Sequence, residues 1–188
     1  HSGASAPSRF APSCLVPEVD QLLLGARLAP FLDPYLDKAR GERVAGLVRE
    51  GYAGAGADPA FQGVESVLGA CYGELLGSPS EDFHYFKYVP RQRGPGPYPV
   101  VIFLHGSLGN FQGYTWVLKA LADEAGVALV APTFGAGNWW KDTSCDILRR
   151  TREMCAADPE LDESQLWLAA LSNGGTGLTR AVVDHGRE

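Results

Sequence analysis

The chain has 188 residues, with 16 basic and 22 acidic side chains, a formal net charge of −6 and a pI of about 5.2. This acidic balance argues against nucleic acid and against an anionic membrane surface as partners, because both are bound by basic patches. Hydrophobic residues make up 45% of the chain and no apolar run approaches the ~20 residues of a membrane helix. We therefore expect a soluble globular protein, and its compartment, whether secreted, periplasmic or cytoplasmic, stays open.

The first 80 residues lack the alternation that is typical of strands. Residues 1–13 are rich in Ser, Ala and Pro, which predicts a flexible tail. Residues 14–80 carry apolar side chains at three- and four-residue spacing, which predicts a helical extension. We expect this extension either to cover one face of a sheet or to form a lid over a pocket.

Several interruptions are expected within the extension. Pro30 and Pro34 should break the first part into short helices, because proline removes a helical hydrogen-bond donor. Residues 51–59 (GYAGAGADP) predict a flexible connector, and residues 62–76 predict a helix that ends at a glycine.

Residues 81–188 predict alternating strands and helices. The expected strands cover residues 83–89, 100–104, 127–131 and 165–171, and the expected helices cover residues 113–125, 143–157 and 174–185. Because helices separate the later strands, we expect an α/β fold with a parallel sheet and crossover helices.

Two turns at strand ends carry the candidate chemistry. The first is LHGSLGN at residues 104–110, and the second is AALSNGG at residues 169–175. In a parallel sheet, ligands bind at the carboxyl ends of the strands, and both turns lie there. We therefore expect the two turns to form one site.

The second turn has the pattern of a nucleophile elbow. Ser172 has Ala170 two residues before it and Gly174 two residues after it, and a sharp strand-to-helix turn needs such small neighbours. The N-terminus of the following helix offers backbone N–H groups and a positive dipole end, which favour an oxyanion. In the first turn, His105, Gly106 and Ser107 fit a turn that aims another N–H at the same point, with His105 as a structural residue rather than a proton carrier.

These segments resemble the α/β-hydrolase superfamily. The resemblance rests on YPVVIFLHGSLGN (98–110), VALVAPTFGAG (127–137) and LWLAALSNGG (166–175), and it covers about residues 83–188. It is nearest in style to the prolyl-oligopeptidase, dienelactone-hydrolase and carboxylesterase branches.

The resemblance implies a catalytic assignment. Ser172 would be the nucleophile of a serine hydrolase that cleaves an ester or peptide bond in a small-molecule ester or peptide substrate. The backbone N–H groups of Asn173 and Ser107 would form the oxyanion hole. Trp139 and Trp140 follow a glycine-rich loop at a strand end, and we expect them either to line a substrate pocket or to pack against a missing part of the protein.

The sequence departs from the family after the elbow. The acid and the histidine of the triad follow the serine in this fold, yet only 16 residues (188 − 172) follow Ser172. Asp184 and His185 lie roughly 18 Å farther along the expected helix, beyond hydrogen-bond reach, and His84 lies on an outer strand. We therefore expect a core truncated after the nucleophile helix, inactive alone, whose sheet edge is completed by a missing C-terminal part or a second chain.

Two other functions compete with this hypothesis. The missing triad members favour a non-catalytic hydrolase-like module that binds a ligand or a partner. The glycines at 174, 175 and 177 point weakly to a nucleotide site, but they lack the spacing of a dinucleotide loop. No cofactor or metal is indicated, because the four cysteines and four histidines show no ligand spacing.

Overall fold

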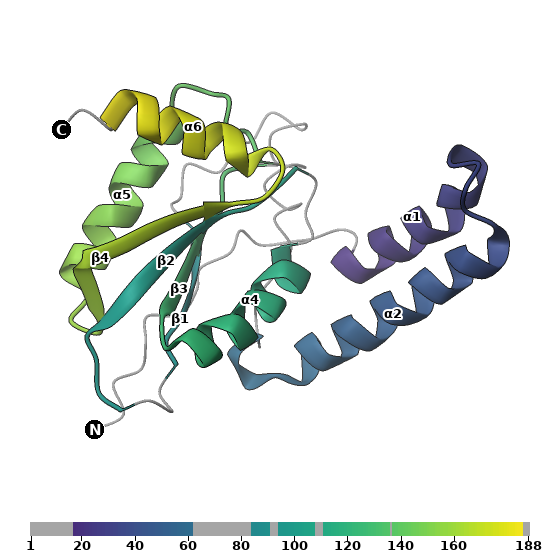
Figure 1. The fold of residues 1–188 in the computed structure, drawn as a ribbon, viewed down its shortest axis with the longest axis horizontal. Helices are drawn as coiled ribbons and strands as arrows, with labels where there is room; N and C mark the ends of the chain where they lie inside the picture. Colours follow the sequence, from purple (N-terminus) through teal and green to yellow (C-terminus); the bar gives the residue numbers. More distant parts are fainter. Residues whose placement is uncertain (1–16, 62–83, 91–93, 108–110, 136, 186–188) are drawn as a thin grey trace.

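The computed structural model describes residues 17–61, 84–90, 94–107, 111–135 and 137–185 (Figure 1). The expected tail over residues 1–13 and the expected helix over residues 62–76 lie outside the described residues. No helix in the described ranges is both long and apolar enough to cross a bilayer.

A four-stranded mixed sheet forms the centre of the fold, in the order β1-β3-β2-β4. The strands are β1 (Tyr85–Tyr88), β2 (Tyr98–Leu104), β3 (Ala128–Pro132) and β4 (Leu161–Ala170). The pairs β2–β3 and β2–β4 are parallel, as the sequence predicts, whereas β1 runs antiparallel to β3. The loop between β1 and β2 is too short to hold a crossover helix, so the chain reverses its direction there.

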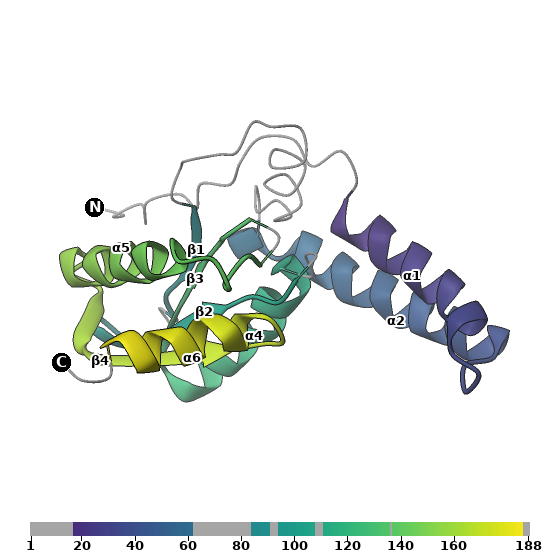
Figure 2. The same cartoon turned by 90° about the horizontal axis from the view of Figure 1, so that it is seen from above.

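Helices cover both faces of the sheet and make a three-layered α/β core (Figures 1 and 2). The helix α4 (Phe111–Ala125) packs on one face, and α5 (Ser144–Ala157) and α6 (Gly174–His185) pack on the other. Alternate residues of β2 divide between two apolar clusters, since Val100 and Ile102 belong to the cluster beneath α5 and α6, and Phe103 to the cluster beneath α4. This double burial explains the continuous apolar run of the central strands.

The extension forms a helical hairpin of α1 (Glu18–Leu32) and α2 (Lys38–Ala57), which extends away from the sheet past α4 (Figures 1 and 2). The short helix η1 (Pro59–Phe61) then carries Phe61 to the sheet, where its ring stacks on Phe86 at 4.9 Å. The described residues of the extension pack against α4 and, through Phe61, join the apolar cluster on the same face of the sheet.

Two expected interruptions of the hairpin are wrong. The helix α1 continues through Pro30, and α2 continues through the glycines of residues 51–57. Packing accounts for both outcomes. A Cβ atom placed on Gly41 would lie 2.9 Å from the Ala26 carbonyl oxygen and 2.9 Å from Pro30, so the glycine lets α2 pack closely against α1 at Pro30. A Cβ atom on Gly54 would lie 2.8 Å from the Trp116 ring of α4, so tertiary contact outweighs the low helix propensity of glycine.

Strand β4 lies at the edge of the sheet and begins four residues earlier than expected. Its pairing with β2 is irregular between Pro99 and Val100, where the partner of β2 shifts from Asp162 to Leu166. Within the described ranges no strand pairs with the outer edge of β4, and Trp167 on this strand is 51% exposed. The core described by the structure therefore stops at the strand that leads to Ser172.

Lys87 makes the first testable prediction, which concerns stability. Its side chain is 3% exposed, and its Nζ lies 2.5 Å from Asp158 Oδ2 and 3.0 Å from Glu160 Oε2. Replacing Lys87 by Met should lower the free energy of unfolding by about 2 kcal/mol, because two carboxylates lose their cation while keeping part of their contact with water. Urea denaturation measures this change, and Arg149→Met, which removes an exposed ion-paired arginine, is the control that should change little. Equal effects of the two substitutions would contradict the assignment.

Candidate active site

The two turns that the sequence singles out meet at the same end of the sheet. The Leu171 N–H donates to the Leu104 carbonyl oxygen at 3.1 Å, which extends the pairing of β2 and β4 to the start of the second turn. A Cβ atom placed on Gly106 would lie 3.2 Å from Ser172 Cβ and 3.9 Å from Ser172 Oγ. Between the turns lies a cleft of about 160 Å³, lined by His105, Gly106, Ser107, Tyr114, Leu171 and Ser172.

Ser172 has a strained backbone. Its φ is 50°, and among the described residues no other non-glycine residue has a positive φ. A residue in this left-handed region costs roughly 1–3 kcal/mol and persists only where the surrounding structure imposes it. The side chain of Ser172 is exposed to the cleft. This is the sharp strand-to-helix turn that a nucleophile elbow requires.

Gly174 fits against the end of β2 with no space for a side chain. A Cβ atom on Gly174 would lie 2.8 Å from the Leu104 carbonyl carbon and 2.9 Å from the His105 carbonyl oxygen. A Cβ atom on Gly177 would lie 3.1 Å from both Leu104 and Trp139, so this glycine also serves close packing. Packing therefore explains two of the three glycines that pointed to a nucleotide loop.

The predicted oxyanion donors flank Ser172. The N–H groups of Gly174, Gly175 and Thr176 have backbone acceptors in the turn, whereas the described residues provide none for the Asn173 N–H. The Asn173 side chain donates from Nδ2 to the Gly137 carbonyl oxygen, which ties the elbow to the loop after β3. Ser107 is exposed and lines the cleft together with Ser172.

His105 is a structural residue of the first turn. Its Nδ1 lies 2.7 Å from the Gly106 carbonyl oxygen, and its Nε2 accepts from the Phe134 N–H at 3.2 Å. Complete burial lowers the pKa of His105 to about 4, although the hydrogen bond with Gly106 acts in the opposite direction. The imidazole is therefore neutral near pH 7, with Nδ1 as the donor and Nε2 as the acceptor. Because both nitrogens are engaged, His105 has no free nitrogen for the Ser172 hydroxyl.

The structure does not bring the two tryptophans into the cleft. Trp139 is fully buried, and its Nε1 donates to the His105 carbonyl oxygen at 2.8 Å. The centroid of its ring lies 5.5 Å from that of His105 and 5.5 Å from that of Phe134, so Trp139 packs against the first turn and the loop after β3. Trp140 is 54% exposed, and its carbonyl oxygen accepts from Arg180 of α6.

No histidine other than His105 lines the cleft among the residues that the structure describes. Among its lining residues His105 is the one histidine, and none of them is a carboxylate. His84 is buried at the start of β1, where its carbonyl oxygen accepts from the Thr133 N–H at 2.9 Å. Asp184 and His185 belong to the last turn of α6, which begins only after Ser172.

Tyr114 is the lining residue that sequence reasoning missed. It lies in the first turn of α4 and is 38% exposed. Its position shortly after the first strand-end turn was the available signal, because a helix that follows such a turn begins beside the site. Tyr114 and Leu171 give the cleft an aromatic and an aliphatic wall.

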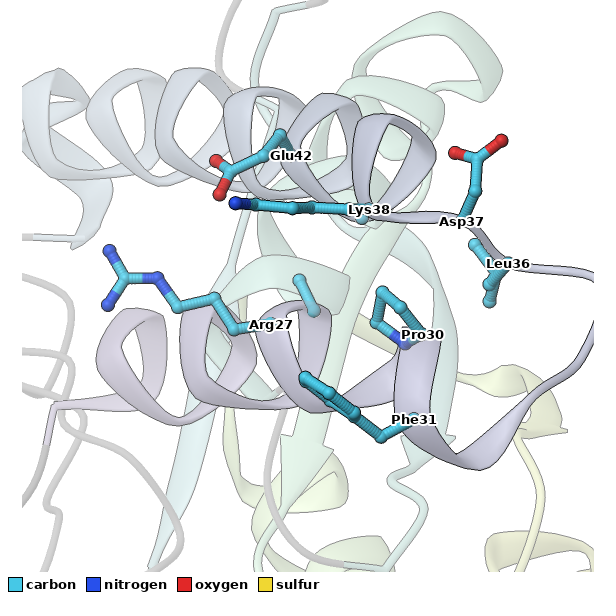
Figure 3. Close-up of a pocket in the computed structure, with 9 residues that line it drawn as sticks. Arg27, Pro30, Phe31, Leu36, Asp37, Lys38 and Glu42 are labelled. Atoms are coloured by element: carbon cyan, nitrogen blue, oxygen red, sulfur yellow. The ribbon is translucent and has the colours of Figure 1, made fainter.

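A second and larger pocket, of about 490 Å³, lies between α1 and α2 (Figure 3). Apolar side chains such as Phe31 and Leu36 share its lining with charged ones such as Arg27 and Glu42. It shares no residue with the Ser172 cleft, so we do not place the reaction there. Within the described residues, no three His, Cys, Asp or Glu side chains are grouped to hold a metal ion.

No protein-family model matches the chain, and no curated protein matches it. Among solved structures, the chain is similar to the crystal structure of 2,6-dihydroxy-pseudo-oxynicotine hydrolase, with 18% identity and a TM-score of 0.43 over 81% of this chain and 41% of that one. It is also similar to a serine-to-alanine mutant of LAE6, an α/β-hydrolase enzyme from the metagenome of Lake Arreo in Spain. That match has 15% identity and a TM-score of 0.47 over 72% of this chain and 52% of that one. The chain thus spans about half the length of these two structures or less.

The packing at Gly174 makes a prediction with a matched control. Gly174→Ala should lower the free energy of unfolding by about 1–3 kcal/mol, because the new methyl group meets the backbone of Leu104 and His105. Gly175→Ala should not destabilise the protein, since nothing lies within 4 Å of a Cβ atom there. Thermal unfolding of both variants tests this difference, and a Gly174→Ala variant as stable as the wild type would contradict the close contact.

The burial of His105 predicts how stability depends on pH. A histidine with a pKa of about 4 in the folded state and roughly 6.5 when unfolded binds its proton more readily in the unfolded chain. Stability should therefore fall as pH drops from about 6.5 to 4, by up to about 1.4 kcal/mol per pH unit from this residue. His105→Gln should be less stable at pH 7 but should lose less stability over that range. Urea denaturation at several pH values measures this difference. If the wild-type protein and His105→Gln lose the same amount of stability as pH falls, the result would contradict a neutral, buried His105.

Proposed function

We propose that this chain forms the nucleophile half of a serine hydrolase that acts on an ester or peptide bond. One observation carries the proposal: Ser172 holds a positive φ at a strand-to-helix turn and faces the Gly106 turn across a small cleft. Evolution retains such strain where the chemistry needs an exposed, fixed hydroxyl.

The reaction follows from the groups around Ser172. A base takes the hydroxyl proton of Ser172 as Oγ attacks the substrate carbonyl carbon, and the carbonyl oxygen becomes an oxyanion. The bond to the leaving group then breaks, the base gives its proton to the leaving group, and an acyl-enzyme remains. Water gives a proton to the same base as it attacks the acyl carbon, and the bond to Oγ breaks to release the acid and return the proton to Ser172. The N–H groups of Asn173 and Ser107, together with the positive end of α6, hold the oxyanion, and one such donor contributes roughly 10²–10³ to kcat.

The base and the acid of this mechanism come from outside the described cleft. His105 cannot take the Ser172 proton, because both of its nitrogens are engaged and its pKa is lowered to about 4. We infer that a histidine and a carboxylate outside the described cleft complete the triad, and that the groups lining the cleft are inactive without them. Among the described residues no strand pairs with the outer edge of β4, so this edge is a suitable place for further strands to join.

A non-catalytic binding module is the second candidate. It is favoured by the same lining of the cleft, which holds no carboxylate and no available imidazole. On this alternative, Ser172 would contact a ligand or a partner without being activated as a nucleophile.

A serine-directed probe distinguishes these candidates. The natural protein that contains this chain should gain the mass of one adduct after treatment with a fluorophosphonate, and Ser172→Ala should abolish the adduct and the hydrolysis of nitrophenyl esters. Ser164→Ala, which removes another exposed serine near the start of β4, should leave both unchanged. An unlabelled natural protein, or an adduct that survives Ser172→Ala, would overturn the proposal, and the first outcome would favour the binding module.

A further inference from the structure

A buried carboxylate joins the helical hairpin to the helix that borders the cleft. Glu18, the first residue of α1, is 3% exposed. Its Oε2 accepts from the Gln112 N–H at 3.1 Å, and its Oε1 accepts from the Gly113 N–H at 3.1 Å and from the Tyr52 hydroxyl. Three donors from two separate parts of the chain therefore meet on one side chain.

The two backbone donors belong to the first turn of α4. Such N–H groups have no acceptor within their own helix, and a carboxylate there also interacts favourably with the helix dipole. Here the cap comes from residue 18, which is 94 positions from Gln112 in the sequence. The start of α4 therefore depends on the hairpin for its hydrogen bonds.

Tyr52 fixes the same turn by packing. A Cβ atom placed on Gly113 would lie 2.9 Å from the Tyr52 hydroxyl oxygen and 3.2 Å from its ring, so the turn and the phenol are in close contact. Farther along the same two helices, Gly54 packs on Trp116, and just beyond α2 Asp58 lies 3.3 Å from Lys119. The hairpin is thus held along α4 by several contacts, of which the Glu18–Tyr52 pair is nearest to the cleft.

The turn held by this pair supplies one wall of the Ser172 cleft. Tyr114 follows Gly113 directly and lines the cleft with Ser107 and Ser172. A displacement of the Gln112 and Gly113 backbone would carry Tyr114 with it, because all three residues belong to one helical turn. The hairpin is therefore coupled to the shape of the cleft although no residue of α1 or α2 lines it.

We propose that Glu18 and Tyr52 are positioning residues of the substrate site: they hold the first turn of α4, and through it Tyr114, against the cleft beside Ser172. The proposal rests on the function proposed above, because it assigns Tyr114 to the wall that contacts the substrate. It makes the helical hairpin a part of the substrate site rather than an appended unit.

A carboxylate is the group that this arrangement requires. An ionised Glu18 is an acceptor only, so it satisfies all three donors, whereas the amide of glutamine would direct N–H groups at one or more of them. The pKa of Glu18 is raised, because burial outweighs the hydrogen bonds from Tyr52 and from the start of α4. These bonds act in the opposite direction and stabilise the charged form that caps the helix.

The test measures ester hydrolysis by the natural protein that contains this chain. Tyr52→Phe and Glu18→Gln should raise KM for a nitrophenyl hexanoate by about 2- to 10-fold, the loss expected from a hydrogen bond, with a smaller change in kcat. A nitrophenyl acetate, whose short acyl group reaches less of the wall, should be affected less. Rates are expressed per mole of folded protein, so that a loss of stability alone does not count.

Two further variants separate positioning from stability. In a Tyr114→Ala background, Tyr52→Phe should have little further effect on KM, because the wall through which it acts is absent. Asp37→Ala removes the cap of α2, where Asp37 accepts from the Arg40 N–H at 2.7 Å. This control should destabilise the hairpin without changing KM. Unchanged KM in both Tyr52→Phe and Glu18→Gln, or an equal rise in Asp37→Ala, would overturn the proposal.

Hydrogen exchange gives a measurement that does not depend on activity. Amide exchange over residues 111–114 should accelerate in Glu18→Gln and Tyr52→Phe, and should accelerate much less in Asp37→Ala, which leaves both contacts to α4 in place. If the wild-type protein hydrolyses no ester and gains no fluorophosphonate adduct, the proposed function fails, and this exchange still decides whether the pair holds the turn. If esters are hydrolysed but exchange and KM do not change, the positioning proposal fails while the proposed function stands.

Discussion

The arrangement of the candidate site depends on the close contact between the end of β2 and the turn after β4. The Leu104 carbonyl oxygen accepts from the Leu171 N–H, and the backbone of residues 104 and 105 leaves no space for a side chain at Gly174. With the turn pressed against β2, the chain must reverse sharply before α6 begins. The positive φ of Ser172 and its exposure to the cleft both follow from this reversal.

Buried polar groups hold the loops around this contact. His105 joins the β2 turn to the loop after β3 through Phe134, and the Trp139 indole donates back to the His105 carbonyl oxygen. Asn173 joins the elbow to the same loop through Gly137. Because an unpaired buried polar group is costly, a network in which each member has its partner specifies one arrangement of the three strand ends. His105, expected from the sequence to be structural, and Trp139, a candidate for the substrate pocket, thus both fix the backbone that presents Ser172.

Much of this could be predicted from the sequence, because its signals are local. The apolar runs of β2 and β3, the helical spacing after them and the small residues around Ser172 each reflect neighbours in the chain. Two of the glycines that also allowed a nucleotide loop, Gly174 and Gly177, are explained only by the surfaces that they approach. The order of the strands in the sheet, with β1 antiparallel at one edge, became evident only from the strand pairing in the structure.

What the sequence did not reveal depends on contacts between distant segments. The helix α2 continues through its glycines because Gly54 packs on the Trp116 ring of α4. The cap on α4 comes from Glu18, which is the first residue of α1 and lies 94 positions earlier in the sequence than Gln112. Tyr114, which lines the cleft, belongs to the turn of α4 that Glu18 caps. The hydrolase resemblance therefore indicated Ser172 as the candidate nucleophile, whereas the shape of the cleft around it became evident only in three dimensions.

The central claim is that Ser172 and the two flanking N–H groups form one oxyanion-binding unit. A crystal structure of the natural protein after reaction with a fluorophosphonate tests it most directly. We predict a phosphoryl group on Ser172 Oγ, with one phosphoryl oxygen within hydrogen-bond distance, about 2.7–3.1 Å, of both the Asn173 and Ser107 nitrogens. A phosphoryl oxygen directed away from both groups, or no group on Ser172, would contradict the account.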